Sequence, residues 1–142
     1  MTENERNKIR VIVCRVDERA EVIEIEDKLE AMQEVVGGLI QEYMPWEDEV
    51  AIICNEEGKM MGLPLNRGIS SDEGQLQDII AGDFFICYAP IESERFLSMP
   101  PELEEKYLRK FEKPEMFFRA GNEIHAVPYE PRRTEISREQ AR

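Results

Sequence analysis

Two short segments of this chain are apolar at every position, and they constrain its fold more than any other feature. Residues 50–54 read Val-Ala-Ile-Ile-Cys and residues 84–88 read Phe-Phe-Ile-Cys-Tyr. Short runs rich in β-branched and aromatic residues are typical of strands that are buried on both faces. Turn-forming residues bound them, since an Asn-Glu-Glu-Gly turn follows the first and Pro90 closes the second. The sequence therefore predicts that both segments are central strands of a sheet.

The remaining periodic segments predict further strands and two helices. Residues 8–16 and 21–26 alternate as the two strands of an opening hairpin, residues 39–44 form another strand, and residues 116–119 with 123–127 form a closing hairpin. The first helix begins at Asp27, which has the form of a capping box with Glu30, and ends before two glycines. The second opens at Pro100 and ends before Pro114. Their predicted buried stripes are Leu29, Met32, Val35 and Val36, and then Leu103, Tyr107, Leu108 and Phe111.

These elements predict an α+β fold with a single domain, built on a mixed, largely antiparallel sheet with two main helices. The length of 142 residues suits one hydrophobic core. We expect that domain to span residues 8–130, after a disordered N-terminus at residues 1–7. Residues 131–142 are expected to form a basic, loosely ordered C-terminal tail.

The net charge of −13 is high for this size and is unevenly distributed. Residues 131–142 carry four arginines and two glutamates, so residues 1–130 carry −15. Such a body repels DNA, RNA and anionic membranes, and no direct nucleic-acid or membrane binding is expected. No apolar run approaches the roughly 18 residues of a membrane helix, and residues 1–7 contain no signal-peptide core, so we expect a cytoplasmic protein. The acid excess leaves open that the protein mimics a nucleic acid.

The reactive residue types carry no catalytic or metal-binding pattern. Cys14, Cys54 and Cys87 each lie in an apolar run with spacings that match no metal or redox motif, which predicts buried, reduced thiols. His125 is the one histidine, and no nucleophile motif surrounds it or a cysteine. We therefore predict no catalytic residues, no metal site and no cofactor.

The segment from residue 59 to residue 82 keeps neither a helical nor a two-residue period. Irregular segments of this length inside a compact domain often carry function. Asn66 and Arg67 lie between Pro64 and Gly68, so we expect an exposed turn in which a guanidinium and an amide bind a phosphate or carboxylate. Arg119 and Trp46 are the expected wall residues of this ligand- or partner-binding site. The rival interpretation makes Arg67 a structural ion-pair partner that fixes the loop.

Several segments in order give the chain a family resemblance. They are residues 29–38 (LEAMQEVVGG), 50–59 (VAIICNEEGK), 62–67 (GLPLNR), 78–86 (DIIAGDFFI) and 114–119 (PEMFFR). Over roughly residues 8–130 the chain resembles a family of small bacterial proteins that form a domain of unknown function. Phages, plasmids and integrative elements commonly encode such proteins. The resemblance implies an accessory role in a mobile element, directed against host defence, and it supplies no catalytic residues.

The sequence thus predicts a non-enzymatic binding protein that modulates or counters a host factor. The partner is expected to be a host protein or a small anionic ligand, and a homodimer is left open. Two alternatives remain at this point: an acidic nucleic-acid mimic that occupies a basic host protein, and an undescribed enzyme that uses the Asn66–Arg67 loop.

Overall fold

A five-stranded sheet forms the centre of the molecule in the computed structural model, which describes residues 7–131. The strand order is β2-β1-β7-β4-β3, and every pairing is antiparallel. The strands are β1 (Lys8–Cys14), β2 (Glu21–Glu26), β3 (Ile40–Tyr43), β4 (Val50–Asn55) and β7 (Phe84–Tyr88). All six residues of β4 and the first four of β7 are buried. The prediction that these two apolar segments are central strands is confirmed.

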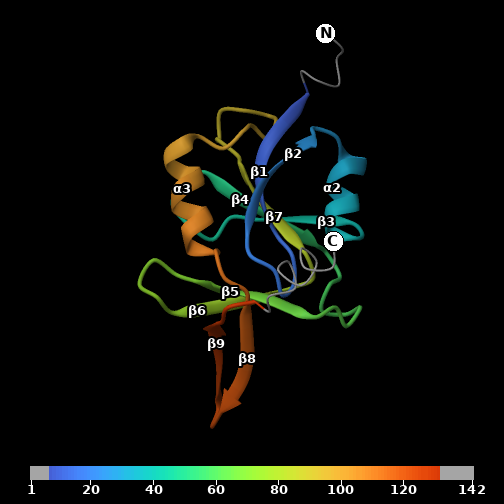
Figure 1. Cartoon of the computed structure of the whole chain (residues 1–142). Helices are drawn as coiled ribbons and strands as arrows, with labels where there is room; N and C mark the ends of the chain where they lie inside the picture. The colour runs from blue at the N-terminus through green and yellow to red at the C-terminus, as the bar shows by residue number, and fades with distance from the viewer. Residues whose placement is uncertain (1–6, 132–142) are drawn as a thin grey trace, which may run out of the picture.

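A helix covers each face of this sheet (Figure 1). α2 (Leu29–Val36) packs Met32 and Val36 against Val11, Ile53, Phe85 and their neighbours on one face. α3 (Pro101–Lys110) packs on the opposite face, where Tyr107 and the following Phe111 join Trp46, Ile52 and Phe84. The two helices follow from the predicted apolar stripes, and the α+β class is confirmed.

The start of the first helix differs from the prediction. α2 begins at Leu29 after an extended Lys28, and no side chain caps it. The Asp27 carboxylate instead accepts hydrogen bonds from Arg95, at 2.6 Å from Nη2. The capping box was therefore the wrong interpretation, because a long-range ion pair uses the carboxylate that it required. Leu29, placed in the buried stripe by its spacing, is 52% exposed.

The segment predicted to be an irregular loop is a β-hairpin. β5 (Leu65–Ser70) pairs with β6 (Leu76–Ala81), and the register shifts twice, between Leu65 and Arg67 and between Ile69 and Ser70. Each shift marks a bulge, which inserts a residue and breaks the two-residue alternation of a strand. The absence of a period was therefore real, but it reflected bulges rather than a loop. Ile69 and Ile80 of this hairpin complete the core on the α3 side of the sheet.

The closing hairpin extends away from this body (Figure 1). β8 (Glu115–Ala120) pairs with β9 (Glu123–Pro128), as predicted, and its main contact with the rest of the chain is with β5. The expected disorder at residues 1–7 and the loose tail at 131–142 fall outside the described residues, except for Asn7 and Pro131. Within residues 7–131, no helix has the length and apolar character needed to cross a membrane.

Candidate functional site

Asn66 and Arg67 lie inside the protein rather than on an exposed turn. Their exposed fractions are 1% and 0%. Asn66 is the extra residue of the first bulge in β5, because Leu65 pairs with Ala81 and Arg67 with Ile80. A bulge lets two consecutive side chains point to the same side of a strand. The expectation of an exposed turn was therefore wrong.

The Arg67 guanidinium joins three parts of the chain through hydrogen bonds. Nε and Nη2 donate to the Phe111 carbonyl at 3.2 and 3.1 Å, and Nη2 also donates to the Glu18 carbonyl at 2.7 Å. Nη1 donates to Oδ1 of Asn66 at 2.7 Å. The planar guanidinium group holds its N–H donors at fixed angles, so it can bind several acceptors at once. Arg67 thus fastens β5 to the β1–β2 turn and to the end of α3.

Asn66 extends the same network towards the sheet. Its Nδ2 donates to the carbonyls of Cys14 and Gly82 at 2.9 and 2.8 Å. Within residues 7–131 no carboxylate forms an ion pair with Arg67, and burial lowers the pKa of its guanidinium. Carbonyl dipoles satisfy this charge in place of the ion pair that the rival interpretation proposed. That the two residues bind a ligand stays a prediction, and direct contact would require β5 to open.

The other two predicted site residues lie elsewhere. Trp46 belongs to the core, with its ring 4.9 Å from Tyr107 and 5.9 Å from Phe111, and its indole N–H donates to the Ser70 carbonyl. Arg119 is exposed on β8, paired in register with Ile124. The structure therefore brings Asn66 and Arg67 together and leaves Arg119 separate on the hairpin. Trp46 forms part of the wall of a different depression.

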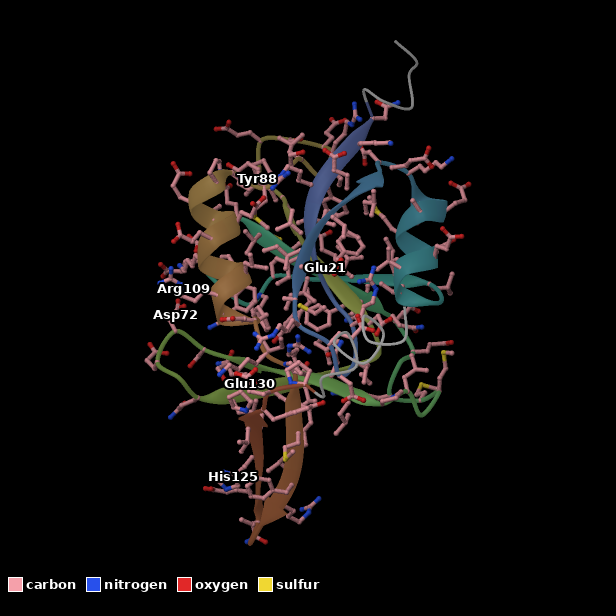
Figure 2. The ribbon with its side chains drawn as sticks, in the orientation of Figure 1. Glu21, Asp72, Tyr88, Arg109, His125 and Glu130 are labelled. Carbon is pink, nitrogen blue, oxygen red and sulfur yellow. The ribbon has the colours of Figure 1, made fainter. Side chains whose placement is uncertain are left out.

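That depression, which we call the acidic groove, has a volume of about 540 Å³. One wall is the segment between β3 and β4, and the other is the segment that follows β7. Its residues are Glu42, Met44, Trp46, Glu47, Asp48 and Glu49, with Ala89, Pro90, Ile91, Ser93, Glu94, Arg95 and Phe96. Figure 2 shows Tyr88, which directly precedes the groove residue Ala89, at the opposite end of the molecule from His125 on the β8–β9 hairpin.

Two large apolar side chains of the acidic groove are exposed. Ile91 is 89% exposed and Met44 is 43% exposed, although both are large hydrophobic residues. Pro90 and the Glu49 carboxylate fix the backbone beside Ile91, since Glu49 Oε2 accepts the Ile91 N–H at 2.8 Å. The exposure of Ile91 is therefore held by the local structure.

The charges in the acidic groove divide into paired and unpaired groups. Asp48 accepts hydrogen bonds from Lys106 at 2.6 Å and from the Tyr107 hydroxyl at 2.8 Å, and these bonds lower the pKa of its carboxyl. The one arginine of the groove, Arg95, pairs with Asp27. Glu42, Glu47 and Glu94 have no ion pair to any of residues 7–131. The acidic groove thus presents free negative charge around an apolar centre.

The reactive residue types do not assemble a centre in the described part of the chain. Cys14, Cys54 and Cys87 are free and buried, and burial raises the pKa of Cys14 to about 12. His125 lies on the projecting hairpin, where it stacks on Phe118. Among residues 7–131 no three or more histidine, cysteine or acidic side chains are grouped to hold a metal. Apart from Trp46, which was expected in the wall of a different site, the groove residues were missed in the sequence because their two segments are about 40 residues apart. Ile91 between a proline and a glutamate was the one local signal.

The geometry defines an antiparallel α+β protein with an exposed acidic and apolar groove. Residues 9–112 match the model of a family described as a domain of unknown function (DUF3846), and the chain belongs to that family. No curated protein matches the chain, and no solved structure matches it. The matched span contains the five-stranded sheet apart from Lys8, both helices and the whole acidic groove, and it ends before β8 and β9.

Proposed function

We propose that this protein is a non-enzymatic binding protein whose acidic groove holds a basic, partly apolar segment of a partner protein. The observation that carries the proposal is the 89% exposure of Ile91 beside the unpaired carboxylates Glu47 and Glu94. An apolar anchor surrounded by charge of one sign selects a segment with an apolar side chain and flanking lysines or arginines.

The partner is a protein rather than a small anionic ligand. The acidic groove repels anions, and Arg67, the cation expected to receive one, has no exposed surface. The resemblance to proteins commonly encoded by mobile elements makes a host protein the expected partner, and a host defence factor is one such protein. On this proposal the protein acts by occupying the partner's basic surface, without chemistry of its own.

The test is capture from bacterial host lysate followed by measurement with the purified partner. Wild type would be compared with two groove variants, Ile91→Ser and Glu47→Lys. The control is Glu34→Lys, which makes the same charge change as Glu47→Lys at an exposed position of α2. We expect one protein captured by wild type and Glu34→Lys, with affinity at least tenfold lower for the two groove variants. Binding should weaken with added salt, because the contact is between opposite charges. Equal affinity for all four proteins would contradict the proposal.

A further inference from the structure

The β8–β9 hairpin presents a face, apolar except for His125 and Glu123, that the described residues do not cover. The register pairs Met116 with Val127, Phe118 with His125 and Ala120 with Glu123, and strand alternation puts these six side chains on one side, here called the outer face. Met116 is 52% exposed and Phe118 is 50% exposed. The Phe118 and His125 rings stack at 5.4 Å in the middle of this face.

The hairpin is held at its base and free along its length. Glu115 accepts the Gly68 N–H at 2.7 Å, and the Tyr129 hydroxyl donates to Asp17 at 2.5 Å. Glu130, at the same junction (Figure 2), pairs with Arg19 and Lys113. In the described chain no third strand pairs with β8 or β9. A two-stranded hairpin is marginally stable in water, so this one gains from a covering partner.

Charge decides which partner fits the outer face. Residues 115–128 carry two glutamates and one arginine, a net charge of −1 in a chain of −13. A basic partner would be attracted to the acidic body and the acidic groove rather than to this segment. The near-neutral hairpin also projects away from the body, so two copies can meet there while their acidic bodies stay apart.

We propose that the outer face binds the same face of a second copy, in a two-fold symmetric dimer centred on the Phe118–His125 row. With the two-fold axis along that row, Ala120 of one copy lies opposite Met116 of the partner subunit, so a small side chain faces a large one. The same axis places Glu123 opposite Val127 of the partner subunit, at the edge of the contact.

The size of the contact sets the expected affinity. Strands of six residues are roughly 20 Å long, so one hairpin face offers less than the roughly 800 Å² per partner of a standard interface. A dissociation constant in the micromolar range is therefore expected, and the dimer should form at high protein concentration.

Sedimentation equilibrium of the full chain, from about 1 to 500 μM and in low and high salt, tests the proposal. We expect a monomer–dimer equilibrium that high salt strengthens, because salt screens the repulsion between acidic bodies. Phe118→Asp and Met116→Asp should each weaken it at least tenfold. Leu29→Asp, at a position equally exposed on α2, and the groove variant Ile91→Ser should leave it unchanged.

Each other outcome would overturn the proposal. If the wild-type chain stays monomeric at 500 μM in high salt, the proposed dimer does not form. A dimer that high salt dissociates, or that survives both hairpin variants, uses another surface. Hydrogen exchange gives a measurement without substitutions: amides 116–127 should gain protection as concentration rises. Protection independent of concentration would mean that the chain's own residues 132–142 cover the face, and not a second copy.

Discussion

At Arg67 the sequence predicted the chemistry of the side chain well and its location in the fold badly. An arginine beside an amide, between a proline and a glycine, indicates a polar cluster, and Arg67 and Asn66 do form one. The sequence does not reveal that the cluster faces inward, because the bulge at Asn66 depends on the pairing of β5 with β6. Trp46 is similar, since its spacing does not show that it contacts α3.

Replacing Arg67 with alanine should destabilise the whole domain. The change leaves the buried Phe111 carbonyl and the partly buried Glu18 carbonyl without their donor and opens a cavity. Breaking such a network costs about 3–5 kcal/mol, which should lower the melting temperature by roughly 10 °C or more. Arg119→Ala removes the same charge from an exposed position and should melt like wild type. If Arg67→Ala melted normally but lost partner binding, Arg67 would be a binding residue after all.

At the scale of elements, local periodicity predicted every strand and helix that keeps a regular pattern. The strands alternate or are apolar throughout, and the helices have stripes three and four residues apart. The β5–β6 hairpin was missed because two bulges break its period, and the α2 start was misplaced because Asp27 bonds to Arg95, 68 residues away. Interactions that depend on tertiary structure were therefore the ones that sequence could not supply.

The packing of α2 leads to a prediction for Met32. Met32 is 5% exposed in the cluster formed with Val11, Ile53 and Phe85. Met32→Asp would place a carboxylate there without a partner, at a cost of several kcal/mol, and the domain should unfold. Leu29→Asp is the control, because that position is half exposed and lies in the first helical turn, where an acidic residue is favourable. Thermal melting followed by circular dichroism would decide; cooperative, unchanged melting of Met32→Asp would refute the burial of this helix face.

At the scale of the whole molecule, Tyr88, which directly precedes the groove segment 89–96, lies at the opposite end from His125 on the projecting hairpin (Figure 2). A partner in the groove and a second copy on the hairpin could therefore bind at the same time. The two contacts should also respond oppositely to salt, since one joins unlike charges and the other keeps like charges apart. In a dimer formed through the hairpin each copy would keep its own groove, which gives two partner sites per assembly.

The net charge of −13 also predicts the behaviour of the chain towards nucleic acids. Binding to DNA or RNA requires cations that displace counterions from the phosphates, and such binding is strongest at low salt. Duplex DNA and single-stranded RNA should therefore show no gel shift with micromolar protein at about 20 mM salt, where the Debye length is roughly 20 Å. The arginines at 132, 133, 138 and 142 provide the control, because they make residues 131–142 a net positive end, with four arginines and two glutamates, on an otherwise acidic chain. A shift that disappears when these four become alanine would show that a basic segment outweighs the repulsion of the acidic body. A shift that persists in that variant would contradict the assignment of the body as a repulsive surface.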